Sequence, residues 1–532
     1  MRLVLLSLFL ASTSMAQPTP SEPRAPQDGA TGVVTLLHTN DFHGRTGPIT
    51  VTSEDATAQA DDPGGPPQPF GRTGEIGGFA AQATVVARLR EELGADRTVL
   101  VHAGDAFSDD LLANLTEGEA VVRLMNRLGY AFMALGNHDF DYGVARTRAL
   151  QEIADFPMRG ANVIDEATGE PFLGDPTLVV DRGGLRVGLL ALGYPNTEWT
   201  ASPEAVRGLR FTSGVEAARG AVTALRERAD LVVVVSHQGT TVDRVLAREV
   251  PGIDVILGGH SHNLIVPPER VGNTWITEAR SDGLDVGQID VTVRDGRVVG
   301  VEQTVYALWS DRVAPDASVA ALVDSLRAPH RARLDEVLAT AEEAVPREYK
   351  TESPFDRLVG DVLRAETGAA VALLPGVGYG VTLGPGPVTR EALYTLLPHP
   401  ATLVTVELTG AQILQVLEQS AANLAPASPE RTVGGLVQSS GLGYTMDLGR
   451  PLGTRVSDVL VEGEPLDPAR WYRVATHSGV LAGTHRYEAV GQGRCVERSD
   501  RRVTDLVEAH LIQAGTVRAP ATGGVTVRHA AP

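Results

Sequence analysis

The feature that most constrains this chain is a series of five short polar stretches in its first half, each following an apolar run. They hold the residues that can bind a metal ion or move a proton, which are Asp41 and His43, Asp105, Asn137 and His138, His237, and His260 and His262. Apolar runs such as VVTLL, LVVVVS and VILGG are typical of buried parallel strands. Because open α/β sheets place ligands at the carboxyl ends of their strands, we expect these side chains to meet at one rim.

These residue types suit a site for two metal ions. Two divalent cations roughly 3.5–4 Å apart can share a bridging carboxylate, while imidazoles and an amide fill the outer positions without excess negative charge. Asp105 is the natural bridge. Asp41 and His43 lie two positions apart, as do His260 and His262, and in extended backbone both members of such a pair would project to the same side.

The order of the motifs resembles that of a known family. DxH, GD, GNH, SH and GHSH follow one another as in the calcineurin-like metallophosphoesterases, and HTNDFHGR with GNHDFD resembles their 5'-nucleotidase branch, which includes the UDP-sugar hydrolases. The resemblance extends from about Val33 to the end of the chain. It implies an α/β fold, namely a four-layer αββα sandwich followed by a smaller α/β (α+β) 5'-nucleotidase C-terminal domain.

The resemblance also implies a role for each residue of the motifs. The first metal ion falls on Asp41, His43, Asp105 and His262, and the second on Asp105, Asn137, His237 and His260. His138, oriented by Asp141, is implied to assist the transition state or the leaving group, because a carboxylate partner holds the tautomer of an imidazole. Mixed His, Asp and Asn ligation suits Mn, Zn, Co or Fe as the two divalent metal ions. The implied reaction is hydrolysis of a phosphate ester by metal-activated hydroxide.

The second half departs from the family pattern where the substrate is chosen. The usual GGGIR is PGVGYG here, so that Tyr379 stands in the place of an arginine, and the two aromatic positions that enclose a base fall at His399 and Gly479. Arg357 still matches a substrate arginine of the family. Further candidates for a rebuilt pocket are Tyr379, His399, Tyr444, His477 and Arg486. Each of these side chains could instead have a purely structural role, without contact to the substrate.

Three functions therefore remain open. The first is hydrolysis of a 5'-nucleotide or nucleotide-sugar type substrate. The second is thiosulfohydrolase-like cleavage of a sulfur-linked group in periplasmic sulfur oxidation, because PGVGYGVTLGPGPVTRE resembles the corresponding segment of those enzymes, although their first metal motif normally lacks the NDFHGR form. The third is a non-catalytic secreted binding protein, which the complete set of ligand positions disfavours.

The first residues indicate export. MRLVLLSLFLASTSMA has an early arginine, an apolar run and a small-x-small cleavage site, so we expect a secretory signal peptide over residues 1–16 and a flexible leader over residues 17–31. No later stretch approaches about 20 apolar residues, so we expect no membrane span. The expected location is periplasmic or extracellular. A single cysteine, Cys495, excludes an internal disulfide.

Charge and length limit the partners and the domain count. A net charge of −20 would repel a polyanion, so we expect a small-molecule phosphoester substrate and no nucleic acid polymer, and no obligate protein partner is evident. A chain of 532 residues is too long for one hydrophobic core. We expect a catalytic domain over residues 32–306, a helical linker over residues 307–347 and a substrate-binding domain over residues 348–532.

Overall fold

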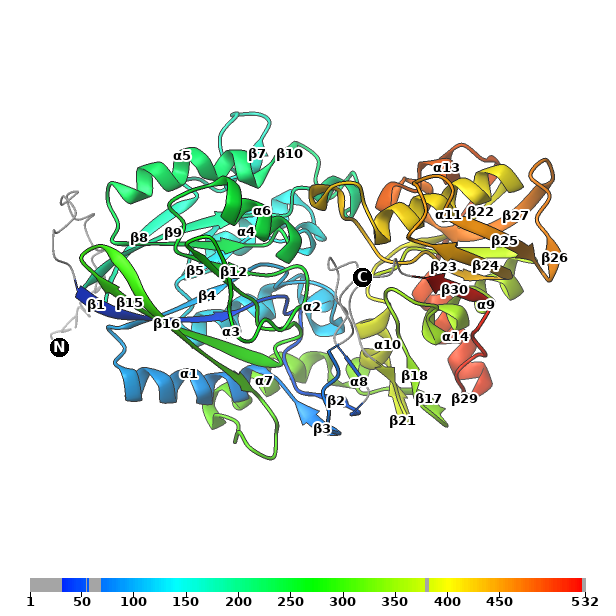
Figure 1. Cartoon of the computed structure of the whole chain (residues 1–532). Helices are drawn as coiled ribbons and strands as arrows, with labels where there is room; N and C mark the ends of the chain where they lie inside the picture. The colour runs from blue at the N-terminus through cyan, green and yellow to red at the C-terminus, as the bar shows by residue number, and fades with distance from the viewer. Residues whose placement is uncertain (1–30, 54, 57–67, 378–381, 529–532) are drawn as a thin grey trace, which may run out of the picture.

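Two six-stranded sheets lie face to face in the N-terminal half of the chain (Figure 1). The first contains, in order, β16 (Arg297–Ala307), β15 (Asp285–Arg294), β1 (Thr31–Thr39), β4 (Thr98–His102), β5 (Phe132–Ala134) and β6 (Met158–Arg159). The second contains β13 (Glu269–Val271), β14 (Thr274–Thr277), β12 (Val255–Gly258), β11 (Leu231–Ser236), β9 (Leu185–Leu192) and β8 (Thr177–Arg182). The apolar runs form buried parallel strands, as predicted: β1 pairs with β4, and β11 pairs with β9 and β12.

Three apolar clusters separate four layers. Side chains such as Leu36, Val101 and Val233 fill the space between the two sheets. The helices on the outer face of the first sheet are α1 (Phe79–Leu93), α3 (Glu119–Leu128), α4 (Val144–Ile153) and α7 (Ala317–Arg327). The second sheet is covered by α5 (Gly214–Arg226) and α6 (Thr240–Glu249). The predicted αββα sandwich is therefore confirmed.

The computed structural model describes residues 31–53, 55–56, 68–377 and 382–528. The predicted signal peptide, the leader up to residue 30 and Tyr379 lie outside the described residues. Within the described ranges, no helix combines the length and the hydrophobicity that crossing a membrane would require.

The segment predicted as a helical linker is only partly helical. After α7 and the short α8 (Arg331–Leu334), Val337–Ala341 forms a strand, β17. It pairs with β21 (Gly386–Thr389) and β29 (Thr516–Val517). The helical spacing of apolar residues carries no information about strands that lie far away in the sequence. Pairing with those strands decides the conformation of this segment. The domain boundaries stay a prediction.

The C-terminal half is built on a five-stranded sheet. Its order is β23 (Gln438–Ser440), β19 (Val371–Leu374), β27 (Trp471–His477), β22 (Thr402–Thr409) and β28 (Arg494–Arg502). One apolar cluster joins this sheet to α9 (Pro354–Thr367), α10 (Arg390–Leu396) and α14 (Val503–Ala514), and another joins it to α11 (Gly410–Leu424). The second cluster also includes a smaller sheet made of β26 (Glu464–Pro465), β25 (Val456–Val461), β24 (Leu442–Asp447) and β30 (Val525–Arg528). This α/β arrangement agrees with the predicted C-terminal domain.

The two halves touch at the end of the sandwich that carries the polar stretches (Figure 1). Tyr394 of α10 packs against Leu111 and Leu112 of α2 (Leu111–Thr116). On the other side, Asn196 donates a hydrogen bond to the carbonyl oxygen of Glu430 (2.8 Å). These contacts hold the C-terminal half over the ends of the parallel strands.

Candidate metal centre and cavity

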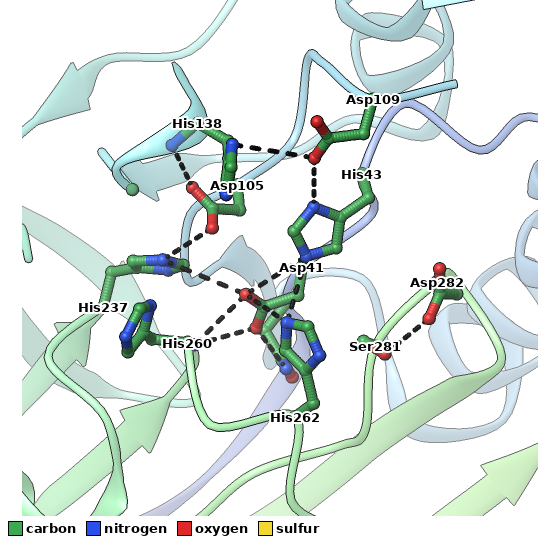
Figure 2. Close-up of polar contacts among 12 residues, drawn as sticks. Asp41, His43, Asp105, Asp109, His138, His237, His260, His262, Ser281 and Asp282 are labelled. Atoms are coloured by element: carbon green, nitrogen blue, oxygen red, sulfur yellow. Dashed lines mark hydrogen bonds and ion pairs between the residues drawn. The ribbon is translucent and has the colours of Figure 1, made fainter. Parts of the chain in front are cut away.

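Six of the candidate ligands meet just beyond the ends of β1, β4, β11 and β12, which belong to the two large sheets (Figure 2). Asp41, His43 and His262 form one group, whose ligating atoms all lie within 4.8 Å of one another. Asp105, His237 and His260 form a second group by the same measure. In the first group the Asp41 carboxylate lies 3.4 Å from His262 Nε2, and in the second the Asp105 carboxylate lies 3.0 Å from His237 Nε2.

The backbone conformation of these residues differs from the extended form that the sequence suggested. The pairs Asp41/His43 and His260/His262 lie in the loops after the strands, since β1 ends at Thr39 and β12 at Gly258. The residues with left-handed φ angles are Asp41 (52°), His43 (48°), Asp105 (53°), His260 (74°) and His262 (57°). Side chains other than glycine seldom adopt this conformation, and it clusters at functional sites where the surroundings enforce it. The expectation of two extended pairs is therefore wrong, although their side chains do converge.

Hydrogen bonds fix which ring nitrogen of two histidines faces the centre. His237 Nδ1 donates to the carbonyl oxygen of Ala103 at 2.6 Å, and His43 Nδ1 lies 2.6 Å from Asp109 Oδ2. Partners of this kind hold the tautomer and turn Nε2 towards a metal ion. The arrangement therefore orients both rings as ligands.

The donor set fits divalent metal ions. His43 Nε2 and His262 Nε2 face each other at 3.0 Å, a distance at which two imidazole nitrogens need a proton or a cation between them. The buried Oδ1 of Asn137 has no hydrogen-bond partner among the described residues. Burial alone would lower the pKa of His237, but Asp105 and Asp41 raise it to about 10. The carboxylates thus create a place where positive charge is stabilised.

His138 and Asp141 form the predicted pair. His138 Nδ1 lies 2.9 Å from Asp141 Oδ2, which also accepts a hydrogen bond from Ser108 Oγ (3.1 Å). Burial opposes protonation of His138, yet Asp109 and Asp141 raise its pKa well above the usual value. The imidazole is therefore held in one orientation and favours its protonated form.

Two carboxylates at the site were given no role by the sequence analysis. Asp109 contacts His43, while Asp139 accepts backbone N–H bonds from Asp105 (3.0 Å), Ala106 (2.8 Å) and Gly136 (2.8 Å). Asp139 therefore ties together the two loops that carry Asp105 and Asn137. Its place inside the GNHDFD motif was a signal for this role, whereas nothing in the sequence marked Asp109.

A cavity of about 350 Å³ opens beside the metal centre and extends into the C-terminal half. Its walls include His138 and Asp141 on one side and His399, His477 and Gly479 on the other. The ring of His399 stacks on that of His138 with centroids 5.3 Å apart. Burial opposes the shift, but hydrogen bonds to Asp109 and Asp141 raise the pKa of His399 to about 9. The predicted substrate residue His399 thus reaches the cavity as a cation.

Two other predicted substrate residues do not line this cavity. Arg357 pairs with Glu352 and Asp361, each at 3.3 Å, because its position on α9 turns it towards these carboxylates. Tyr444 is 3% exposed and packs in the apolar cluster around α11, with its hydroxyl 3.4 Å from the carbonyl oxygen of Val437. The prediction that either side chain contacts substrate is therefore not supported by its place in the fold.

Of the two remaining substrate candidates, one lines the cavity and the other does not. His477 lines the cavity, and burial lowers its pKa to about 4, so it is a neutral wall residue. Arg486 instead bridges the two halves, because it donates to Asn196 Oδ1 (2.9 Å) and lies over the ring of Trp199 at 5.3 Å. Among the described residues that line the cavity, Tyr349 is the one Phe, Tyr or Trp, so these residues supply no pair of such rings to enclose a base.

Two family models match the chain. Residues 34–264 match the calcineurin-like phosphoesterase model, and residues 333–492 match the model of the 5'-nucleotidase C-terminal domain. Both matches follow the division into an N-terminal sandwich and a C-terminal α/β half.

Two curated relatives cover most of the chain. The trifunctional nucleotide phosphoesterase protein YfkN of Bacillus subtilis is 27% identical over 88% of this chain, which spans 33% of that longer protein. Protein UshA of Yersinia enterocolitica is 25% identical over 83% of this chain and 84% of its own length.

Two solved structures from Thermus thermophilus have nearly the same overall similarity. The sulfate thiohydrolase SoxB superimposes with a TM-score of 0.84 at 28% identity and covers 93% of this chain and 96% of its own. A 5'-nucleotidase precursor superimposes with a TM-score of 0.83 at 29% identity and covers 93% of this chain and 99% of its own. The chain therefore belongs to the calcineurin-like metallophosphoesterases that carry a 5'-nucleotidase C-terminal domain, a family of metal-dependent phosphoester hydrolases.

Proposed function

We propose that this protein uses two divalent metal ions to hydrolyse a phosphate ester of the 5'-nucleotide or nucleotide-sugar type. The observation that carries the proposal is the position of Asp105. Its carboxylate lies 3.0 Å from His237 Nε2 in one ligand group, and Asp41 Oδ1 of the other group lies 3.9 Å from the same nitrogen (Figure 2). A carboxylate in this position can bridge two cations.

The residues that would hold the ions are those of the two ligand groups. We assign Asp41, His43, Asp105 and His262 to one ion and Asp105, Asn137, His237 and His260 to the other. When bound, the ions supply Lewis-acid stabilisation of the phosphoryl oxygens and lower the pKa of water. Mixed imidazole, carboxylate and amide donors suit Mn, Zn, Co or Fe.

His138 would act on the substrate through its second ring nitrogen. Because Nδ1 is held by Asp141 (2.9 Å), Nε2 remains to donate a hydrogen bond or a proton to the phosphoryl group or the leaving oxygen. The raised pKa keeps that proton in place at neutral pH. His138 and Asp141 are therefore the proposed acid and its orienting partner.

The C-terminal half would enclose the leaving group. His399 brings a positive charge to the cavity wall, and the apolar side chains of Leu374, Leu397 and Val503 exclude water from it. With Tyr349 as the aromatic wall residue, binding would depend on the phosphate and on shape more than on base stacking. We therefore infer a broad phosphoester preference in place of strict selection for one base.

The second candidate is cleavage of a sulfur-linked group. Two observations favour it: the TM-score of 0.84 with a sulfate thiohydrolase, and a cavity whose described lining residues include no pair of Phe, Tyr or Trp rings. The same two ligand groups would polarise a sulfonyl group as well as a phosphoryl group. The relatives named as a nucleotide phosphoesterase and a 5'-nucleotidase place this candidate second. Since the family is one of enzymes, a non-catalytic binding protein is not favoured.

We further propose a periplasmic or extracellular location, which rests on the signal-peptide pattern of residues 1–16. A net charge of −20 makes a nucleic acid polymer an unsuitable partner.

A panel of four substrates tests the proposal. Mn-loaded protein is given AMP, UDP-glucose, an aryl phosphate and a thiosulfonate donor, with Asp105→Asn as the blank. Phosphate release from AMP and the aryl phosphate, and release of UMP and glucose 1-phosphate from UDP-glucose, are the expected results, and all are absent in the blank. Sulfate release alone would favour the second candidate, and no release from any of the four would contradict both.

A further inference from the structure

A second cluster of potential ligands lies beside the proposed dinuclear centre. Asp109, His138, Asp141 and His399 each offer one nitrogen or oxygen, and these four atoms all lie within 4.8 Å of one another. Three of these residues come from the N-terminal half, whereas His399 follows α10 in the C-terminal half. The cluster therefore forms only where the two halves meet.

The spacing of the cluster is close to that of a four-coordinate site, with a different oxygen of Asp109 towards each histidine. His138 Nδ1 lies 2.9 Å from Asp141 Oδ2 and 3.8 Å from Asp109 Oδ2. His399 Nε2 lies 3.3 Å from Asp109 Oδ1 and 3.4 Å from Asp141 Oδ2. Tetrahedral ligands about 2.0–2.2 Å from Zn²⁺ are separated from one another by roughly 3.3–3.6 Å. The observed distances lie on both sides of this range, so that small side-chain movements would complete the coordination.

We propose that Asp109, His138, Asp141 and His399 form a third metal site, which binds Zn²⁺ across the two halves and inhibits hydrolysis by occupying His138. The inhibitory part of this proposal rests on the role of His138 in the proposed function. The binding part rests on the geometry alone.

The chemistry of the four donors favours Zn²⁺ over Mn²⁺. Metal binding would release the second ring protons of His138 and His399 to solvent. Two carboxylates and two neutral imidazoles around one dication then leave no net charge, which lowers the cost of placing the ion in the cavity. Among His and carboxylate sites, Zn²⁺ binds more tightly than Mn²⁺. Asp109 Oδ1 is buried and lies 3.3 Å from His399 Nε2. A cation that enters through the cavity would replace this contact with two metal–ligand bonds.

Occupation of the site has a structural consequence. Because His399 is the one ligand from the C-terminal half, a Zn²⁺ ion bound to all four residues would fasten the two halves together. The product would then be retained and new substrate excluded, in addition to the loss of His138 as an acid. Excess zinc is therefore expected to inhibit protein that already holds its dinuclear ions.

Metal content distinguishes this proposal from a simple ion-pair network. The purified full chain, His399→Gln and His477→Gln are dialysed to equilibrium against a series of ZnCl₂ concentrations, and bound zinc per chain is measured by mass spectrometry. His477 is the matched control, because it lines the same cavity from the same half but does not belong to the cluster. We expect wild type and His477→Gln to bind one more zinc ion than His399→Gln. Equal zinc content in all three proteins would overturn the proposal.

Kinetics test the inhibition separately. In Mn-loaded protein the ZnCl₂ concentration that halves aryl phosphate hydrolysis should rise by at least about tenfold in His399→Gln, since even the loss of a group that only orients a ligand weakens metal binding by that much. An unchanged concentration would overturn the inhibitory role. If the additional zinc is bound by protein that hydrolyses none of the phosphoesters, the proposed function has failed and the metal site stands.

Discussion

The ring of Tyr194 stacks on the imidazole of His260 with centroids 3.8 Å apart. The hydroxyl of the same tyrosine donates a hydrogen bond to the carbonyl oxygen of Thr432, at 2.7 Å, in the C-terminal half. One side chain therefore touches both a proposed metal ligand and the domain that encloses the substrate. Tyr194 therefore links the metal centre to the C-terminal half through direct contacts.

Two substitutions of Tyr194 should separate these contacts. Tyr194→Phe keeps the stacking and loses one hydrogen bond between the halves, so we expect KM to rise by roughly fivefold with unchanged metal content. Tyr194→Leu removes the stacked ring as well, and metal affinity should fall in addition. Steady-state kinetics and metal analysis of both variants check this. Loss of metal in Tyr194→Phe would mean that the hydroxyl, and not the ring, supports His260.

Gly136 leaves room for the proposed bridging carboxylate. A Cβ at this position would lie 2.1 Å from Asp105 Oδ1 and 2.5 Å from the Asp105 backbone nitrogen. Gly136→Ala should therefore displace Asp105 and reduce metal content and turnover strongly, while overpacking costs about 1–3 kcal/mol of stability. Gly220→Ala is the control, because a Cβ there meets nothing within 4 Å. A fully active Gly136→Ala protein would show that Asp105 does not need its observed position.

His138→Asn should separate chemistry from metal binding. The substitution removes the proposed acid but none of the proposed ligands of the dinuclear centre, so in Mn-loaded protein kcat is expected to fall by about 10²–10⁴ while two Mn²⁺ ions stay bound. Asp141→Asn should have a smaller effect in the same direction, since it only weakens the orientation of the ring. Unchanged kcat in His138→Asn would remove this residue from the mechanism.

The burial of His38 leads us to predict that the protein loses stability in acid. Its ring is fully buried, neither ring nitrogen has a hydrogen-bond partner among the described residues, and burial lowers its pKa from 6.5 to about 4. Because the folded-state pKa lies below the unfolded one, the stability from the neutral ring is present above pH 6.5 and is lost as the pH falls towards 4. At pH 5 the loss amounts to about 2 kcal/mol.

Urea unfolding at pH 7.5 and pH 5 measures this effect. Between pH 7.5 and pH 5, the free energy of unfolding should fall by about 2 kcal/mol more in wild type than in His38→Met, because the other titrating groups are common to both proteins. His510→Met, at an exposed position, serves as the control and should behave like wild type. If His38→Met shows the same pH dependence as wild type, the buried ring does not titrate as described.

The sequence predicted the parts of this protein that depend on local pattern. Continuous apolar runs such as LVVVVS can form only buried strands here, and their ends carry the polar stretches that hold Asp105 and His237. The order of these stretches was enough to predict the sandwich and the group of ligands. The left-handed backbone of Asp41 and His43 was not predictable, because residue spacing alone suggests an extended chain.

The parts that depend on distant contacts were not accessible from the sequence. Asp109 matters because His43 and, from the other half, His399 lie beside it. Arg357 matched a family position, yet its helix turns it towards Glu352 and Asp361. In each case the neighbours of a side chain are set by packing between segments, which a linear pattern does not record.

The most direct test of the central claim is phosphate release as a function of bound Mn²⁺. Metal-free protein is titrated with MnCl₂, and hydrolysis of an aryl phosphate is followed together with the number of ions bound per chain. We predict that turnover is absent without metal, reaches its plateau when two ions are bound, and does not appear in Asp105→Asn at any concentration. Full turnover in metal-free protein or in Asp105→Asn would contradict the dinuclear account.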